Sequence, residues 1–525
     1  MSTISSFFGN MTLPSPAAFS MGEAATKGNL GGGLDFLLEK MESRPFQITT
    51  SVLSVVLLYF VFGLFSPQKM KATPYVGKES DPSFHGALKE GYSKFKDSLF
   101  KIPAPHHTVH IIPPKFMNEV KNLPDTKLSF QGQVKDRFSG QYTGLGVNDV
   151  LVNAVKVDVT KNMDHIIKEF EDEMPFALNT TFGELKDWTE IPFYHKGAEI
   201  VGYVAGRIFV GHPLGRNDKW QPLTIQSMAS LATSDELWEY PEMFHGLVHY
   251  FLSHVKAVKQ YLVDGAKVLT PIVESRRKVA ASGTKGPKPA DMTQWIMDQS
   301  SEKDRYDVAH IVETQMMGSV VAIHTTAMAI SQVMYDLIQY PEHIAPLREE
   351  WKRVLGEHNG QFNKSSLSQL EKLDSFLKES QRHKPTGSIT LNRRINQEIK
   401  LSNGIVLEKG IHVGVASAAL GFDPEIYPDP HKFDGFRFYK LRQIPGNEKK
   451  WHFATAAGDQ LFWGYGKDAC PGRFFASNLM KIMTIEFLEK YDFQFRDGVR
   501  PPDVIRDFRT IPNPVFPILM KSRKA

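Results

Sequence analysis

The chain has 525 residues, of which 23% are charged and 11% are aromatic, and its formal net charge is +4. This composition is ordinary for a globular protein, and so small a charge gives no reason to expect nucleic-acid binding. No repeat or long low-complexity linker divides the sequence. A single large domain therefore fits the sequence, although the length would also allow several of the usual ~100–200 residues.

The first 65 residues predict a tail followed by a membrane anchor. Residues 1–45 are rich in Gly, Ser, Ala and Met, which favours a loose tail, and they carry a glycosylation sequon at Asn10. Residues 46–65 are uncharged and mostly apolar, and about 20 such residues at ~1.5 Å each span a hydrocarbon core of roughly 30 Å. More lysines follow this run than precede it, which predicts that the C-terminal side is cytosolic. A cleaved signal peptide fits less well, because the run begins far from the N-terminus and lacks a small-residue cleavage site.

The rest of the chain predicts a mainly α protein with small β-sheets. Helical patterns dominate from Val147 to Leu355, and residues 211–217 predict a turn between two helices. Short runs rich in β-branched residues predict strands at Val109–Pro113, Ile389–Leu391, Ile399–Leu401 and Val406–Val413.

A long helix is expected from Arg305 to Leu337, a stretch with no proline and one glycine. It resembles a second membrane span in length, but polar residues near its centre favour a helix through a soluble core. Among them are His324, Thr325 and Thr326, whose tandem hydroxyls can bond back to carbonyl groups and bend the helix. A His-Thr-Thr triplet by itself is more often structural than catalytic.

Glu379 and Arg382 are three residues apart and would share one face of a helix. The same Glu-x-x-Arg spacing recurs at Glu274, Glu302 and Glu350, where a solvated and weak ion pair is the simplest interpretation. The helix around Glu379 also carries an apolar stripe for burial, made by Leu370, Leu373, Phe376 and Leu377.

Cys470 is the only cysteine, so an internal disulfide is excluded. It lies in a Gly-rich loop before an apolar helix, and Pro471 suits the first position of that helix. The free N–H groups and the dipole at such a helix start favour a negative sulfur. The alternative is a buried, inert cysteine. Glycines around it would let the backbone pass close to a flat, bulky group such as a haem: Gly464, Gly466 and Gly472.

This loop resembles the haem-binding loop of cytochromes P-450. The family pattern Phe-x-x-Gly-x-x-x-Cys-x-Gly is matched at Gly466, Cys470 and Gly472. The resemblance implies a haem whose axial ligand is the Cys470 thiolate, a ligation that favours O–O cleavage. Trp463 stands where the family has Phe, and Asp468 stands where the family usually has a basic residue that faces a haem propionate.

The long helix is similar to the oxygen-activating helix of the same family. By this resemblance Thr325 would lie beside bound dioxygen and steer protons to it, with Thr326 next to it. His324 occupies the position of the usual acid. A neutral imidazole can relay protons near pH 7, and filling a polar pocket is the alternative role.

The resemblance also assigns residues that would hold the haem and its surroundings. Glu379 and Arg382 would match the family's Glu-x-x-Arg helix, with Arg437 as their third partner. Such a carboxylate stays buried because each charge is paired. Lys156 and Arg393 would contact propionates, or else are surface cations. The remaining residues that the resemblance places around the cofactor are Trp463, Gly466, Gly472 and Arg473.

Further roles are implied only by where residues lie along the chain, compared with members of the family. Substrate contacts are expected from residues 138–145, 386–391 and 512–516. Lys467, Arg473 and Lys481 would form a basic docking face for an acidic reductase, or else an ordinary solvated surface.

The resemblance therefore implies a membrane-anchored haem-thiolate monooxygenase of the cytochrome P-450 fold, with residues 66–525 as the catalytic domain. Electrons would come from NADPH through a cytochrome P-450 reductase, with cytochrome b5 as a second donor, at the endoplasmic reticulum membrane. The sequence looks close to fungal diterpene oxidases of the ent-kaurene oxidase type, which implies a lipophilic terpenoid substrate. Polyketide and meroterpenoid substrates remain alternatives. So do a haem-thiolate isomerase or dehydratase that needs no reductase and a haem protein that binds without turnover.

Overall fold

The computed structural model describes residues 73–78, 84–104, 107–225, 234–283, 286–506 and 508–523. The expected tail and the expected anchor at residues 46–65 lie outside the described residues. The helices that the structure defines include α3 (His85–Phe95), α4 (Met117–Val120), α5 (Phe130–Arg137), α6 (Gly140–Thr143), α7 (Asp149–Asn153), the π-helix η2 (Ala154–Val159), α8 (Met163–Phe182), α9 (Phe193–Phe209), α11 (His245–Val248), α12 (Ser253–Ala281), α13 (Met292–Gln299), α14 (Val308–Gln339), α15 (Ile344–Glu357), α16 (Lys364–Gln369), α17 (Glu371–His383), α18 (Ser417–Gly421), α19 (Arg437–Arg442) and α20 (Arg473–Lys490).

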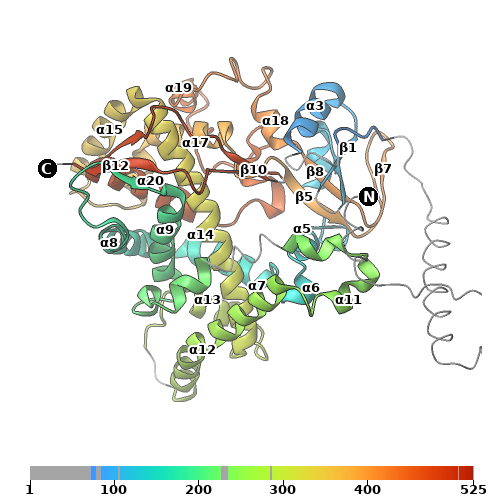
Figure 1. Cartoon of the computed structure of the whole chain (residues 1–525), viewed down its shortest axis with the longest axis horizontal. Helices are drawn as coiled ribbons and strands as arrows, with labels where there is room; N and C mark the ends of the chain where they lie inside the picture. The colour runs from blue at the N-terminus through green and yellow to red at the C-terminus, as the bar shows by residue number, and fades with distance from the viewer. Residues whose placement is uncertain are drawn as a thin grey trace, which may run out of the picture. The chain divides into compact units, whose positions relative to one another are not determined.

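Helix α14 forms the centre of this part of the chain, with α9, α12, α13, α17 and α20 packed against it (Figure 1). It runs without interruption for 32 residues, and the Asp307 carboxylate caps its start by accepting a hydrogen bond from the Ala309 N–H. Among the described residues α14 alone has the length and hydropathy of a membrane span, yet 78% of its most apolar window is buried inside the protein. The prediction of a core helix is therefore confirmed.

The strands form small sheets, as predicted. The largest has the order β1-β2-β8-β5-β3, in which β2 and β8 are parallel and the other neighbours are antiparallel. A three-stranded sheet has the order β4-β12-β9, and two hairpins pair β10 with β11 and β6 with β7. The strand bounds are β1 Phe100–Pro103, β2 Thr108–Ile111, β3 Leu128–Ser129, β4 Thr189–Ile191, β5 Thr390–Ile395, β6 Ile399–Lys400, β7 Val406–Leu407, β8 His412–Val415, β9 Tyr491–Phe495, β10 Val504–Arg506, β11 Arg509–Ile511 and β12 Ile518–Ser522.

Two strand predictions need correction. The strand expected at Val406–Val413 is split into β7 and β8, because Gly410 turns the chain with a positive φ of 92°. Strand β4 interrupts the region that was expected to be helical, and it pairs with β12 near the end of the chain. A partner so distant in sequence leaves no local signal at residues 189–191.

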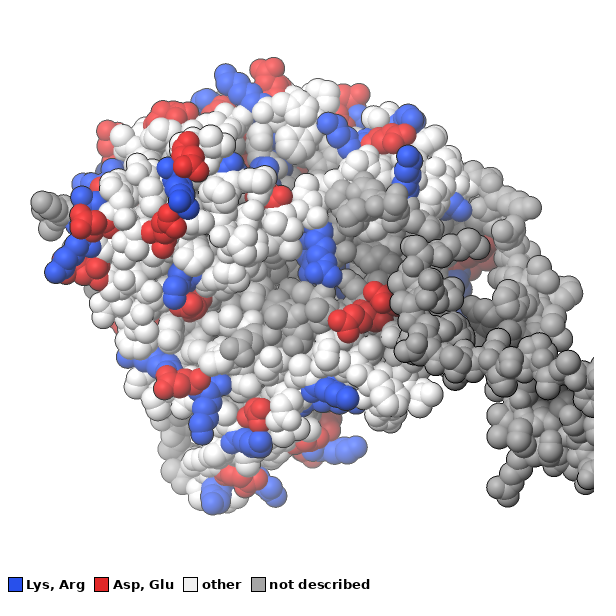
Figure 2. Space-filling model, in the orientation of Figure 1, with Lys and Arg blue, Asp and Glu red and all other residues white. Residues whose placement is uncertain are grey.

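Charged side chains of both signs are interspersed on the face shown in Figure 2. The picture agrees with the small net charge of +4. A surface of this kind favours solubility and gives no single-sign field for nucleic acid on that face.

The packing in front of α19 gives a stability prediction. A Cβ atom on Gly435 would lie 2.5 Å from Phe376 Cδ2 and 2.7 Å from His343 Cδ2. We expect Gly435→Ala to lower the free energy of unfolding by about 1–3 kcal/mol, the usual cost of overpacking, as measured by urea or thermal unfolding. Gly356→Ala is the control, because an added Cβ meets open space in helix α15 and helix propensity should raise stability by up to ~1 kcal/mol. Equal effects of the two changes would contradict the packing argument.

Candidate active site

The Cys470 backbone is held on both sides. Its N–H donates to the Trp463 carbonyl at 2.7 Å, and its own carbonyl accepts a hydrogen bond from Arg473 Nη1 at 2.8 Å. Helix α20 begins at Arg473 with Gly472 as its N-cap, so the prediction that Pro471 is the first helical residue is wrong. A turn at residues 471–472 separates the cysteine from the helix.

The surroundings of the sulfur act on its ionisation in opposite directions. Burial raises the pKa of the Cys470 thiol above its ordinary value, whereas hydrogen bonds from the backbone N–H groups of Gly472 and Arg473 and the Arg473 charge lower it, and burial prevails. A coordinating metal cation deprotonates a thiol outright. A metal cation bound to the Cys470 sulfur would therefore hold it as a thiolate.

The surroundings of Gly466 and Gly472 in this loop differ. A Cβ on Gly466 would lie 2.4 Å from the Lys121 carbonyl oxygen, and Gly466 has a φ of 81°. The close approach of the Lys121 backbone therefore requires glycine at this position. A Cβ on Gly472 would meet only Val155 Cγ1, at 3.8 Å, so η2 lies beside the cysteine loop.

Away from its two ends, helix α14 is buried except for one strip at its middle. Between Met316 and Leu337 the exposed side chains are Val321, at 43%, and Thr325. They are four residues apart and share one face of the helix. Thr325 Oγ1 donates to the Val321 carbonyl at 2.7 Å, the back-bond that the sequence predicts.

His324 and Thr326 lie on other sides of α14, where both are buried. Burial lowers the pKa of His324 to about 4, and neither of its ring nitrogens has a hydrogen-bond partner among the described residues. His324 is therefore neutral at pH 7, whereas Thr325 faces the exposed strip.

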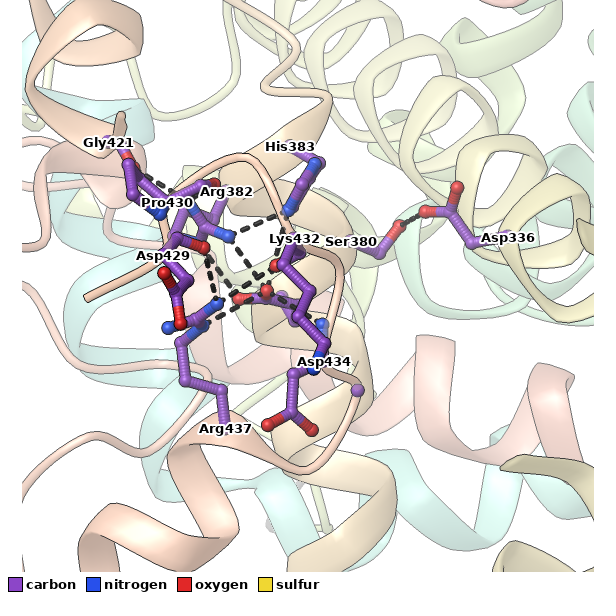
Figure 3. A network of polar contacts seen from close by, with 12 residues as sticks. Asp336, Ser380, Arg382, His383, Gly421, Asp429, Pro430, Lys432, Asp434 and Arg437 are labelled. Carbon is purple, nitrogen blue, oxygen red and sulfur yellow. Dashed lines mark hydrogen bonds and ion pairs between the residues drawn. The ribbon is translucent and has the colours of Figure 1, made fainter. Parts of the chain in front are cut away.

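Glu379, Arg382 and Arg437 are brought together, as Figure 3 shows for the two arginines with His383 beside them. Arg382 donates from Nε and Nη2 to the two Glu379 carboxylate oxygens at 2.8 and 2.7 Å. Arg437 Nε donates to the same carboxylate at 3.1 Å. The two guanidiniums also donate to backbone carbonyls between residues 421 and 432, at Gly421, Pro428, Asp429, Pro430 and Lys432.

Burial separates this ion pair from others with the same spacing. The side chains of Glu379 and Arg382 are both 0% exposed, whereas Glu274 and Arg277 are 45% and 61% exposed and 3.8 Å apart. Glu350 is buried too, but it accepts hydrogen bonds from the N–H groups of Lys372 and Leu373. Sequence spacing alone does not distinguish these cases.

Arg393 and Asp468 form an ion pair that the sequence did not suggest. Arg393 Nε donates to Asp468 Oδ2 at 3.1 Å, and the Arg393 guanidinium lies 4.8 Å from the centre of the Phe130 ring. Arg393 is only 5% exposed, so its interpretation as a surface cation is wrong. Its strand β5 pairs with β8 at Val413, which pairs on the other side with His110 of β2.

His110 was missed by sequence analysis. It is buried and its Nδ1 has no hydrogen-bond partner among the described residues. Burial lowers the pKa of His110 to about 4, so the ring is neutral and can donate one hydrogen bond. The shared pairing with Val413 places His110 and Arg393 on one face of the sheet, which no local sequence pattern reveals.

The lysines expected near the site divide into three environments. Lys156 is exposed on η2. Lys467 Nζ lies 2.7 Å from the Asp125 carboxylate. Lys481 is 4% exposed and lies 2.7 Å from the Asp374 carboxylate. The predicted basic docking face is therefore wrong for Lys481, because α20 is buried at that position.

These residues fit a haem. The Cys470 loop supplies one soft sulfur ligand at the start of α20, and α14, which packs against α20, supplies the exposed strip at Val321 and Thr325. Arg393 and His110 supply a guanidinium and a buried, unpaired ring nitrogen of the kind that binds carboxylates.

The Glu379 network gives a prediction of pH dependence. Burial alone would raise the pKa of Glu379, but hydrogen bonds from Arg382 and His383 and the charge of Arg437 lower it from 4.5 to about 2. The unfolded chain therefore binds the proton first, and stability should fall as pH drops from about 4.5 to about 2. The loss is on the order of 3 kcal/mol.

Unfolding measured over this pH range should show a weaker dependence in Glu379→Gln than in the wild type. Glu357→Gln is the control, since Glu357 forms an exposed ion pair with Arg353 and should keep the wild-type dependence. If Glu379→Gln also kept the wild-type slope, the lowered pKa would be wrong.

Comparison with known proteins agrees with this geometry. Residues 155–519 match the family model for cytochrome P450. The chain is 37% identical to the cytochrome P450 monooxygenase BOA4 of Botryotinia fuckeliana, over 89% of this chain and 95% of that one. It is 34% identical to the cytochrome P450 monooxygenase AN1598 of Emericella nidulans, over 90% and 91%.

The solved structure of retinoic acid-bound cyanobacterial CYP120A1 covers 85% of this chain and 95% of its own, with a TM-score of 0.64 and 16% identity, which shows a shared fold. The predicted fold, oxidoreductase class and fungal type are thus confirmed. The chain belongs to the cytochrome P450 family, whose members use a haem iron and a redox partner to oxidise small molecules, and it is a monooxygenase of this family.

Proposed function

We propose that this monooxygenase oxidises a lipophilic fungal secondary metabolite, with a terpenoid as the first candidate. The observation that carries the proposal is the pairing of two features on adjacent helices. A firmly held cysteine precedes α20, and an exposed threonine lies in the otherwise buried α14. The fungal origin of the relatives supports the class of substrate.

Cys470 would hold the haem iron as its axial thiolate, a ligation that supplies the chemistry for cleaving dioxygen and transferring one oxygen atom. Trp463 and Arg473 would fix the direction of the sulfur through the two hydrogen bonds of the Cys470 backbone. Gly472 would leave room beside it, and Gly466 would let the loop approach Lys121.

Arg393 and His110 would bind the propionates from one face of the large sheet. Lys156, on the helix beside the cysteine loop, would supply a further positive charge. Arginine and a neutral imidazole both donate hydrogen bonds to carboxylates, and arginine adds its charge.

Thr325 would hold a proton at its hydroxyl for delivery to the oxygen side of the site. In the structure this hydroxyl donates to the Val321 carbonyl, and a side-chain rotation would redirect it toward the exposed strip. Thr326 and His324 would support this position from the buried sides of α14. Because the pKa of His324 is lowered to about 4, it would act as a neutral hydrogen-bonding group.

Electrons would come from NADPH through a cytochrome P-450 reductase, with cytochrome b5 as a second donor. Residues 46–65 would anchor the enzyme in the endoplasmic reticulum membrane, with the catalytic domain in the cytosol. A group of exposed apolar side chains supports a membrane-associated enzyme: Tyr240, Met243, Phe244, Leu247, Tyr250 and Phe251.

Cys470→Ala should abolish the carbon monoxide difference spectrum that is characteristic of thiolate-ligated haem in the reduced protein. The reason is the loss of the only thiol in the chain. The spectrum of purified wild type and variant, with haem content measured separately, tests this. A variant that kept the thiolate-type band would contradict the ligand assignment.

Thr325→Ala should lower the coupling, which is the fraction of consumed NADPH that appears as product. We expect a loss of up to roughly 10²-fold, because a positioned proton donor contributes about that much or more. Thr325→Ser keeps the hydroxyl and should retain most of the coupling. Ser331→Ala is the control, because Ser331 makes the same back-bond to Ala327 from a buried side of α14. Equal coupling in Thr325→Ala and wild type would remove Thr325 from the mechanism.

Expression in yeast that contains a reductase, with a panel of terpene scaffolds and product mass spectrometry, tests the proposed substrate class. We expect a product heavier than its scaffold by one oxygen atom, formed only with NADPH. Product formed without NADPH and reductase would favour the isomerase or dehydratase alternative instead.

A further inference from the structure

A second buried carboxylate lies on the same helix as Glu379. Asp374 of α17 is 4% exposed, and its carboxylate has three partners: two cations and one backbone N–H group. Its Oδ1 lies 2.7 Å from Lys481 Nζ of α20. Its Oδ2 accepts hydrogen bonds from Arg442 Nη1 of α19 at 3.2 Å and from the Phe453 N–H at 2.8 Å. Asp374 thus joins three helices to the chain that precedes the cysteine loop.

The cations of this cluster are as deeply buried as the acid. Lys481 and Arg442 are 4% and 3% exposed, and each also donates to a carbonyl, at Leu367 and Glu371 respectively. Although burial raises the pKa of Asp374, the charges of Lys481 and Arg442 lower it below its ordinary value. The carboxylate is therefore ionised, and removing its charge would leave two buried cations without compensation.

Asp374 connects to Cys470 through short hydrogen bonds along the chain. The Phe453 N–H donates to Asp374, and the Phe453 carbonyl accepts from Trp463 Nε1 at 2.6 Å. The Trp463 carbonyl in turn accepts from the Cys470 N–H at 2.7 Å. The rings of Phe453 and Trp463 also meet edge to face, with centroids 5.3 Å apart. The path runs through the Phe453 backbone and the Trp463 side chain, and the contact between the two rings restricts rotation of that side chain.

The Glu379 network acts on a different part of the chain. Its two arginines hold carbonyls between residues 421 and 432. Asp374 instead holds residues 442 and 453. The indole of Trp463 is needed for this second path, because a phenyl ring at that position has no N–H to donate.

We propose that Asp374 is a positioning residue for the thiolate: through Phe453 and Trp463 it fixes the backbone of Cys470 and so the direction of the sulfur. This inference rests on the proposed role of Cys470 as axial ligand. Hydrogen bonds that align a ligand tune its metal, so the strength of the sulfur–iron bond and the reduction potential should respond to Asp374.

The experiment uses the full-length holoenzyme and carbon monoxide as probe. Asp374→Asn, Trp463→Phe and the double variant are compared for the reduction potential and for the rate at which the thiolate-type carbon monoxide complex converts to the thiol type. Each single variant should convert roughly tenfold faster than the wild type, and the double variant no faster than the faster single one, because both changes interrupt one path.

Asp336→Asn is the matched control. Asp336 is also a buried carboxylate, at 3% exposure, but it accepts hydrogen bonds from Ser380 (Figure 3) and from Arg500, neither of which belongs to the path from Asp374 to Cys470. It should lose thermal stability as Asp374→Asn does, while its carbon monoxide complex and potential stay as in the wild type.

Wild-type conversion rates and potentials in Trp463→Phe would overturn the proposal, and this variant answers the question even if Asp374→Asn does not fold. Fully additive effects of the two changes would overturn it too, as would the same conversion rate in Asp336→Asn and Asp374→Asn. A wild type without any thiolate-type band would instead contradict the proposed function.

Discussion

A carboxylate taken out of water is tolerated only where cations and N–H groups surround it. Helix α17 places two such carboxylates about one turn apart, at Asp374 and Glu379. Arg382 and Arg437 compensate Glu379, and Arg442 and Lys481 compensate Asp374. These pairings tie other helices to α17: Arg437 and Arg442 belong to α19, and Lys481 belongs to α20.

The segment between α18 and α20 has little regular structure of its own. It contains α19 and two short 3-10 turns, at Leu461–Trp463 and Gly466–Asp468. Loops of this length are usually functional or disordered, and here the loop ends in Cys470. Backbone groups along it are bound by side chains of the core: the Phe453 N–H by Asp374 and the His452 carbonyl by Lys378. A reactive group on a loop thereby gains the rigidity of a helix.

Lys378 shows how strongly this region is desolvated. It is 1% exposed, and burial lowers its pKa to about 7, against the attraction of Asp374 and Asp459. Its ammonium group lies 5.3 Å from the centre of the Phe438 ring, which stabilises a cation. Lys378 is held by the His452 carbonyl, which accepts its hydrogen bond, and by the Phe438 ring.

Local sequence patterns correctly predicted the features that depend only on residues close together in the chain. The periodicity of apolar residues located α14, α17 and α20, and a spacing of three residues placed Glu379 beside Arg382. Arg437 came from family resemblance, since nothing in its neighbourhood indicates a partner 58 positions away. The exposure of Thr325 could not be predicted from the sequence for a different reason. It depends on which elements pack over α14, and the periodicity of apolar residues does not show that.

The errors share one cause, which is tertiary context. Lys481 was expected on a surface because single lysines on helices usually face water, but α20 is buried on nearly every side, and Asp374 lies 2.7 Å from its ammonium group. Gly466 lies against the backbone of Lys121, a close approach that the sequence did not indicate. In both cases the deciding neighbour is more than 100 positions away in sequence.

Asp468 shows how a departure from a family pattern can be compensated. An acid where a base is usual would be expected to repel a haem propionate. The structure places the buried guanidinium of Arg393 against it, 75 positions away in sequence, so the local charge is balanced. The acid fixes the guanidinium plane, which also rests over the Phe130 ring. In the proposed function a propionate would then meet an arginine that is already oriented, and orientation before binding reduces the entropy that binding must cost. In that proposal the donors to the propionate would lie on the sheet, where the strand register puts His110 on the same face as Arg393.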